Sequence, residues 1–261
     1  MECMTPFYLK EGLKEGTPVP CGKCPNCRKR RVSQWSFRLM MEDKRSVRSR
    51  FITFTYDVEN VPISEKGFMT LRKRDYQLFM KRLRKEQGKV SSYPIKFFCV
   101  GEYGGKFNRP HFHAIVFNIL LDKEAIAGCW KQGMIHVGEV SGASVGYCLK
   151  YMMKPSRISV HQNDDRVKEF MICSKRLGDN YLTEAIRSYH RSDILGRCFL
   201  TTGGIRISMP RYYKNKLYDE MDKVALGVAA VSRKFSVEER TPEEEREYNE
   251  AKIAEFVRMN K

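Results

Sequence analysis

Two strand patterns joined by a short glycine-rich link constrain the fold more than any other feature of this sequence. Residues 95–103 and 111–118 are rich in β-branched and aromatic residues, and the link between them reads GGKFNRP. A short polar link with two glycines between such runs predicts a β-hairpin with antiparallel pairing. The chain is therefore expected to contain an antiparallel sheet.

The segments around the hairpin alternate between strand and helix patterns. The predicted elements are a strand at 51–56, a helix at 70–87, the two hairpin strands, a helix at 123–131, a strand at 134–140 and a helix at 141–153. Thr70 is placed to cap the first of these helices. This order predicts an α+β fold, with an antiparallel sheet, helices mainly on one face and the other face free for a site.

Three regions are predicted along the chain. Residues 1–48 hold a Cys-rich segment and a basic helix, residues 49–156 form the α+β core, and residues 157–261 form a C-terminal extension. The extension is expected to be mostly helical or irregular, and to end in an acidic helix that starts at Thr241-Pro242-Glu243.

The charge of the chain indicates a polyanionic partner. Lys and Arg number 48 against 31 Asp and Glu, which gives a net charge of +17. Nucleic acid is the commonest partner of so basic a protein. Between Arg28 and Arg50 nine residues are basic and two are acidic, so this stretch is a candidate phosphate-contacting surface.

The sequence predicts a reducing compartment and no contact with a membrane. No run of about 18 apolar residues occurs, and the first residues lack the basic start and apolar core of a secretory signal. The nine cysteines are then better explained as thiols or metal ligands than as disulfides.

The strongest chemical signal is Arg109-Pro110-His111-Phe112-His113 at the start of the second hairpin strand. Residues i and i+2 of a strand point to the same side, so both imidazoles project from one face. Glu102, at the end of the first hairpin strand, can lie opposite them. Two imidazoles and a carboxylate predict a Mg²⁺ or Mn²⁺ site, against the alternative of a solvated surface pair with Glu102 capping the hairpin.

A second signal is the tandem pattern Tyr147-x-x-Lys150-Tyr151-x-x-Lys154 on the last predicted helix. The two tyrosines are four residues apart and therefore share one helical face. A cation near a phenol favours the phenolate, which is the stronger nucleophile, and also binds a phosphate. The alternative is that both rings serve only in packing.

A third signal is the C-x₂-C-x₂-C run formed by Cys21, Cys24 and Cys27, to which Cys3 can add a fourth sulfur. Such spacing, with turn residues between the cysteines, is typical of structural zinc sites. An iron–sulfur cluster or three reduced structural thiols remain alternatives. The basic run after Cys27 suggests that this knuckle orients a helix that contacts DNA.

Taken in order, the strand at 51–56, Arg-Pro-His-Phe-His and Tyr-Cys-Leu-Lys-Tyr resemble the three motifs of the HUH endonucleases, which initiate rolling-circle replication. More narrowly, the chain resembles the replication-initiation proteins of microviruses, particularly gokushoviruses. Gly101-Glu102-Tyr103-Gly104 and Pro20-Cys21-Gly22-Lys23-Cys24 carry that narrower resemblance. It is dense over residues 20–155 and thinner afterwards.

The resemblance implies an HUH-endonuclease-like core that nicks and rejoins single-stranded DNA at a replication origin. It implies a divalent ion on His111, His113 and Glu102, and attack by Tyr147 or Tyr151 that leaves a 5′-phosphotyrosyl enzyme. Host or phage helicase and polymerase would be partners in the host-cell cytoplasm. The alternatives are a non-catalytic module that binds single-stranded nucleic acid, and a transposase or relaxase with the same chemistry.

Overall fold

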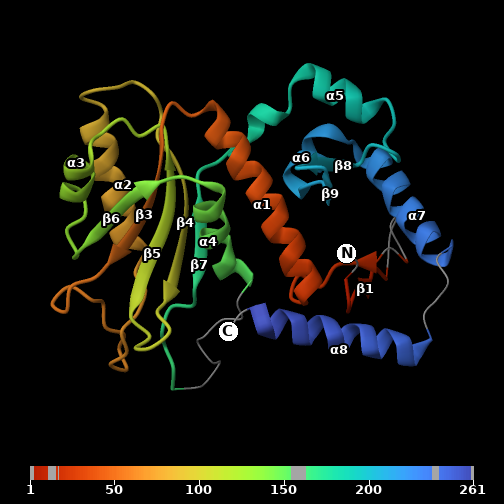
Figure 1. The fold of residues 1–261 in the computed structure, drawn as a ribbon, viewed down its shortest axis with the longest axis horizontal. Helices are drawn as coiled ribbons and strands as arrows, with labels where there is room; N and C mark the ends of the chain where they lie inside the picture. The colour runs from red at the N-terminus through yellow and green to blue at the C-terminus, as the bar shows by residue number, and fades with distance from the viewer. Residues whose placement is uncertain (1–2, 11–15, 17, 154–162, 237–240, 260–261) are drawn as a thin grey trace. The chain divides into compact units, whose positions relative to one another are not determined.

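The computed structural model describes residues 3–10, 16, 18–153, 163–236 and 241–259. The chain forms two compact units (Figure 1). We call Arg38–Gly178 the sheet unit, and Met1–Phe37 together with Asp179–Lys261 the cysteine unit. The three regions expected along the sequence remain a prediction.

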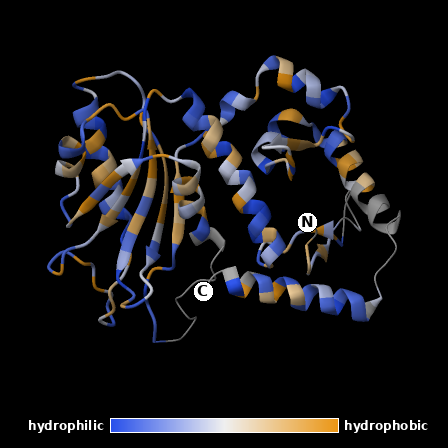
Figure 2. Cartoon of the chain, viewed as in Figure 1, coloured by the Kyte–Doolittle hydropathy of each residue, from blue (hydrophilic) through white to orange (hydrophobic). Residues whose placement is uncertain are grey.

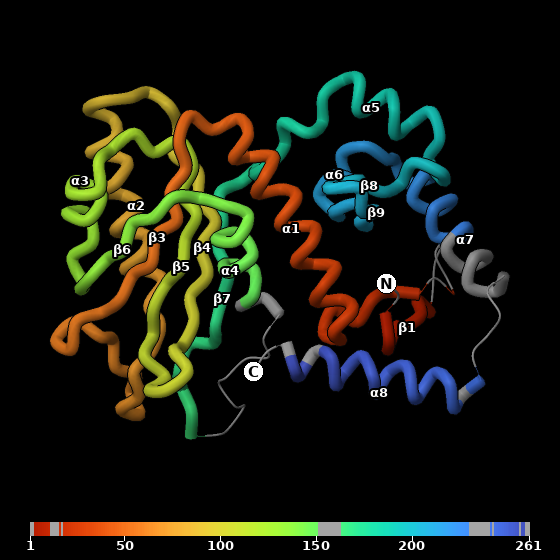
Figure 3. Tube along the Cα trace, viewed as in Figure 1, coloured from red at the N-terminus to blue at the C-terminus, as the bar shows by residue number. Residues whose placement is uncertain are grey.

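The sheet unit is built on a five-stranded antiparallel sheet in the order β6-β3-β5-β4-β7, which can be followed along the chain in Figure 3. Its strands are β3 (Ser49–Thr55), β4 (Lys96–Tyr103), β5 (Pro110–Phe117), β6 (Ile135–Glu139) and β7 (Phe170–Cys173). Its helices are α2 (Lys73–Gln87), α3 (Lys123–Gly128) and α4 (Gly142–Met153). The α+β class and the predicted order of elements are confirmed, whereas β7 was not predicted.

One face of the sheet forms the core of this unit with α2 and α3. Hydrophobic residues are frequent along the central strands (Figure 2). Phe54 is fully buried, and its ring centroid lies 4.7 Å from that of Phe79 on α2 and 5.1 Å from that of Trp130 just after α3. Tyr76, Met80 and Leu83 are buried beside Phe79, which is the stripe that the helical spacing predicts.

The predicted helix cap at Thr70 is wrong. Helix α2 begins at Lys73, and its N-cap residue Arg72 makes no capping hydrogen bond with its side chain. The Thr70 hydroxyl instead accepts a hydrogen bond of 2.9 Å from the backbone N–H of Val167, which leads into β7. A tertiary contact that the local sequence does not signal thus takes the hydroxyl away from the helix.

The second face of the sheet is not left free as expected, because α4 packs on it. Helix α4 contacts β4 and β5, and it buries Val145, Cys148 and Leu149. The sheet therefore has α2 and α3 on one side and α4 on the other. Cys99 and Cys129 are buried as well, as predicted.

The cysteine unit contains the first part of α1 (Pro25–Arg45), two small hairpins and four further helices in its described residues. The hairpins pair β1 (Phe7–Tyr8) with β2 (Pro18–Val19) and β8 (Phe199–Thr202) with β9 (Ile205–Ser208). The helices are α5 (Glu184–Arg191), α6 (Arg211–Leu217), α7 (Glu220–Ser236) and α8 (Pro242–Met259), and a 3₁₀ turn covers Asp179–Tyr181. Phe37 of α1 packs edge-on against Tyr181 and Tyr213.

The predicted start of α8 is confirmed. The Thr241 hydroxyl accepts a hydrogen bond from the N–H of Glu244, and the Glu244 carboxylate accepts one from the N–H of Thr241. This reciprocal pair is a capping box. Among the described residues, no helix is both long and apolar enough to cross a membrane.

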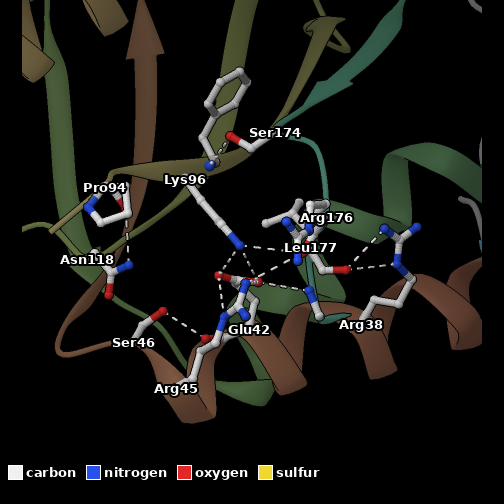
Figure 4. A network of polar contacts seen from close by, with 12 residues as sticks. Arg38, Glu42, Arg45, Ser46, Pro94, Lys96, Asn118, Ser174, Arg176 and Leu177 are labelled. Carbon is white, nitrogen blue, oxygen red and sulfur yellow. Dashed lines mark hydrogen bonds and ion pairs between the residues drawn. The ribbon is translucent and has the colours of Figure 1, made fainter. Parts of the chain in front are cut away.

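A buried carboxylate ties the last turns of α1 to the sheet (Figure 4). Glu42 is fully buried, and its oxygens accept hydrogen bonds from the Arg45 guanidinium at 2.7 Å and from the backbone N–H of Gly178 at 2.8 Å. The Lys96 ammonium of β4 lies 3.2 Å from the same carboxylate. Arg38, one turn earlier, donates to the Leu177 carbonyl.

We expect Glu42→Ala to lower the free energy of unfolding by about 2–4 kcal/mol, because it leaves a backbone N–H and two cations without their shared acceptor. Urea denaturation followed by circular dichroism measures the change. Lys44→Ala, at an exposed position on the same helix, is the matched control and should change stability by less than about 0.5 kcal/mol. Equal stability of the two variants would contradict a structural role for this carboxylate.

Candidate functional site

The β4–β5 hairpin brings Glu102, His111 and His113 together on one face of the sheet. In the antiparallel register Glu102 pairs with His111, and Val100 pairs with His113. Phe112 lies between the histidines in sequence and is fully buried in the core on the opposite face. The predicted placement of the two imidazoles and the carboxylate is what the structure shows.

The three side chains converge on one point. Glu102 Oε1 lies 2.6 Å from His111 Nε2 and 3.0 Å from His113 Nε2. Neighbouring ligand atoms of an octahedral Mg²⁺ or Mn²⁺, bound at about 2.1 Å, are about 3 Å apart. One carboxylate oxygen and two imidazole nitrogens in this arrangement fit a divalent ion that takes oxygen and nitrogen ligands, with positions left for water or substrate.

Two groups that sequence reasoning missed orient the imidazoles. The Arg109 carbonyl lies 3.1 Å from His111 Nδ1, and because a carbonyl only accepts, it leaves the proton on Nδ1 and Nε2 open for a ligand bond. Thr53 Oγ1 of β3 lies 3.1 Å from His113 Nδ1 and can do the same. The alternating pattern of the 51–56 strand was the available signal, since Thr53 pairs directly with His113.

The electrostatics of the site favour an ionised carboxylate. Burial alone would raise the pKa of Glu102, but hydrogen bonds and charge interactions with His111 and His113 outweigh it and leave the pKa below its ordinary value. Glu102 is therefore available as an anionic ligand at neutral pH.

Tyr147 lies beside this cluster on the face that α4 covers. Its ring is edge-on to the His113 imidazole, with 5.1 Å between ring centroids, and edge-on to Phe51 at 6.0 Å. The side chain is 45% exposed, so substrate can reach it from solvent. Lys150, three residues later, is exposed on the same helix. The structure thus places one of the two predicted tyrosines next to a predicted metal ligand.

The second half of the tandem tyrosine pattern falls largely outside the described structure. Tyr151 belongs to α4, so its backbone is one helical turn from Tyr147, but its side chain is not among those described. Lys154 lies outside the described residues altogether. The roles expected of these two residues stay predictions.

In the cysteine unit, the four predicted thiols form a second cluster. The Sγ atoms of Cys3, Cys21, Cys24 and Cys27 all lie within 4.8 Å of one another, and Cys3 Sγ is 3.9 Å from Cys24 Sγ. Four sulfurs around a tetrahedral Zn²⁺, at about 2.3 Å from the ion, are about 3.8 Å apart. The cluster therefore fits a four-thiolate metal site, and the N-terminal segment does bring Cys3 to the other three.

Backbone amides prepare part of this cluster for a charged form. Burial would raise the pKa of Cys21, but hydrogen bonds from Thr5 and from the N–H groups of Cys24 and Lys23 lower it to about 6. Burial raises the pKa of Cys27 to about 12, so a bound cation would have to displace its proton. Between the first two cysteines Gly22 adopts a φ of +73°, a conformation that favours glycine.

Most of the basic side chains in the stretch that was expected to contact phosphate have partners inside the protein. Lys29 pairs with Glu255, Arg30 donates to Cys27 Sγ and Arg28 donates to the Lys23 carbonyl. Further along, Arg48 donates to the carbonyls of Ile119 and Leu121. A DNA-contacting role for this stretch stays a prediction.

Comparison with known proteins fits this geometry. Residues 49–156, which contain the hairpin and α4, match the family described as replication-associated protein ORF2. Through these residues the chain belongs to that family. No solved structure is significantly similar to the chain.

Three phage proteins are similar over a longer stretch. Replication-associated protein ORF2 of Spiroplasma virus 4 is 27% identical over 220 residues, which cover 77% of this chain and 68% of that protein. Replication-associated protein ORF4 of Chlamydia phage 1 is 25% identical over 77% of this chain and 53% of its own length. Replication-associated protein VP4 of Bdellovibrio phage phiMH2K is 27% identical over 75% of this chain and 66% of its own length.

We expect the hairpin cluster to bind Mn²⁺, and His113→Ala to weaken that binding by at least tenfold because it removes a ligand atom. Thr53→Val keeps all three ligands but removes the partner of His113 Nδ1, so a loss of about 10–100-fold is expected. Isothermal titration calorimetry measures both affinities. His136→Ala, on β6 and outside the cluster, is the control; a loss as large as that of His113→Ala would contradict this assignment.

For the four-cysteine cluster we expect close to one equivalent of metal, Zn or Fe, in protein purified without added metal. Elemental analysis measures it, and Cys24→Ser should lower the content to near zero because three thiolates hold the ion less well than four. Cys198→Ser, at a half-buried cysteine outside the cluster, should keep the parent value. A parent protein that is folded but contains no metal would refute the metal site.

Proposed function

We propose that this chain is a metal-dependent endonuclease that nicks and rejoins single-stranded DNA and thereby initiates rolling-circle replication. The observation that carries the proposal is the position of Tyr147, a half-exposed phenol beside His113, whose Nε2 converges with His111 and Glu102. A packing role alone does not explain why such a tyrosine adjoins three converging ligand atoms. The family membership supports a role in phage DNA replication.

The residues suit transfer of a phosphoryl group to a tyrosine. A divalent ion held by Glu102, His111 and His113 would bind the scissile phosphate and withdraw charge from it. The Tyr147 phenolate oxygen forms a bond to phosphorus as the bond from phosphorus to the 3′ oxygen breaks. The 3′ oxygen takes up a proton and leaves as a hydroxyl, and the DNA remains joined to the enzyme through a 5′-phosphotyrosine. Reversal of the same exchange joins two ends, so no outside source of energy is needed.

A second nucleophile would allow the enzyme to cut again while the first strand is still attached. Tyr151 is one helical turn from Tyr147 on α4, and it is our candidate for this step. Lys150 and Lys154 would bind the phosphates next to each tyrosine. The proposed partners are single-stranded DNA at a replication origin, and host or phage helicase and polymerase in the host cytoplasm. The chain contains no G-x-x-x-x-G-K-[ST] motif, so unwinding is assigned to another protein.

We expect Tyr147→Phe and Tyr151→Phe each to keep single-turnover nicking of an oligonucleotide in Mn²⁺, with the covalent adduct on the remaining tyrosine. Each should fail to release closed circles, because termination needs a second phenolate, and the double variant should form no adduct. Mass spectrometry of the adduct peptide identifies the tyrosine. Tyr93→Phe, at an exposed tyrosine in the loop before β4, is the matched control and should behave as the parent.

The same assay separates the proposal from a module that only binds single strands. Such a module would form no adduct in any variant, and Mn²⁺ would not change its products. For an enzyme, His111→Ala should abolish the adduct and retain most of the DNA affinity, because basic side chains supply that affinity. If one single Phe variant cuts, joins and terminates like the parent, that tyrosine only packs and the two-nucleophile mechanism is wrong.

A further inference from the structure

Helix α2 presents an almost entirely basic surface to solvent. Of the residues in α2, six are exposed, and every one except Gln77 is Lys or Arg: Lys73, Arg74, Gln77, Lys81, Arg84 and Lys85. An ordinary solvated helix face mixes charges of both signs. The two acidic residues of α2 do not neutralise this surface, because Asp75 is buried and Glu86 pairs with Lys89.

Some of these cations have a structural task and others have none. The Lys73 ammonium lies over the Phe170 ring, and the Arg84 guanidinium lies over the Phe97 ring. Arg74, Lys81 and Lys85 make no ion pair, hydrogen bond or ring contact with any described residue. We call these three residues the α2 triad. They recur seven and four residues apart, so they line one side of the helix over about 16 Å.

The sheet separates the α2 triad from the candidate nicking site. Phe79 and Met80 of α2 pack on the sheet face that carries Phe112, whereas His111, His113 and Glu102 project from the other face. Phosphates bound by α2 are therefore not the phosphates next to the scissile bond. A DNA molecule on α2 is either a second molecule or a distant segment of the same one.

We propose that the α2 triad is a second DNA-binding site, which holds the phosphate backbone of duplex DNA while the opposite face of the sheet acts on a single strand. Duplex DNA carries one phosphate charge per about 1.7 Å of its axis, so a stretch of about 16 Å offers roughly ten phosphates. The surface reads charge rather than sequence, because its free groups are flexible ammonium and guanidinium ends.

The composition of the surface favours duplex DNA over the other polyanions. Sites for single strands combine cations with aromatic rings on which bases stack, but the aromatic residues of α2, Tyr76 and Phe79, are fully buried. A basic helix that binds membranes inserts its apolar face into the lipid. The apolar face of α2 is already occupied by the sheet, so it is not available to a bilayer.

The test compares the parent with the triple variant Arg74→Gln, Lys81→Gln, Lys85→Gln. Affinity for a 20-base-pair duplex is measured by fluorescence anisotropy over a range of salt concentrations. Each lost phosphate contact should reduce the slope of log K against log salt by about 0.9, so the slope should fall by about 2.7. Affinity at low salt should fall by at least about tenfold. Nicking of a short single-stranded oligonucleotide should stay within about twofold of the parent.

A matched variant controls for the loss of net charge. Lys44→Gln, Lys66→Gln, Lys175→Gln also removes three exposed cations from the sheet unit, but none lies on α2. It should retain most of the parent slope. Thermal unfolding of both triple variants verifies that they fold, and the single variant Lys81→Gln should lose a slope of about 0.9.

The outcomes are distinct. If the α2 triad variant binds the duplex like the control variant, the proposal is overturned. If it loses affinity for a single-stranded 20-mer, or for vesicles with anionic lipid, but not for the duplex, the assignment to duplex DNA is wrong. Absence of nicking in the parent would refute the proposed function only, because duplex binding is measured without any cleavage.

Discussion

The pairing of β4 with β5 is the constraint on which the candidate site depends. Successive side chains of a strand point to opposite faces, so a slip of one residue would move Glu102 into the core and replace it with Gly101 or Tyr103. The observed register instead sets Glu102 opposite His111 and leaves Phe112 between the two imidazoles to anchor the strand from behind. Packing of one face thus holds the ligand atoms of the other face in position.

The two clusters differ in chemistry in a way that keeps their ions apart. The hairpin offers one carboxylate oxygen and two imidazole nitrogens, which suit harder divalent ions such as Mg²⁺ and Mn²⁺. The cysteine unit offers four sulfurs, which prefer Zn²⁺ or iron and bind Mg²⁺ poorly. Each site therefore selects its ion by ligand type. Removal of the more weakly held ion by a mild chelator would leave the sulfur site occupied.

The sequence predicted what depends on short spacing and missed what depends on distant partners. Alternation along a strand was sufficient to place His111 and His113 on one face, and the glycine-rich link was sufficient to bring Glu102 opposite them. Strand β7 is only four residues long and pairs with β4 some seventy residues earlier in the chain, so no local pattern marked it. Thr70 fits a helix cap locally, but its hydroxyl binds Val167 instead. The convergence of Cys3 with Cys21, Cys24 and Cys27 likewise depends on how the N-terminal segment folds back. Thr53 and the Arg109 carbonyl were missed because each acts through a contact with a histidine that its residue type does not indicate.

The cysteine unit is assembled from both sides of the sheet unit in sequence, since Met1–Phe37 joins Asp179–Lys261. During synthesis the ribosome therefore completes the whole sheet unit, Arg38–Gly178, before it makes the second half of the cysteine unit. The sheet can close as soon as β7 emerges, because all five of its strands lie in one continuous stretch. Phe37 must wait for Tyr181 and Tyr213, its ring partners, until the last third of the chain has left the ribosome.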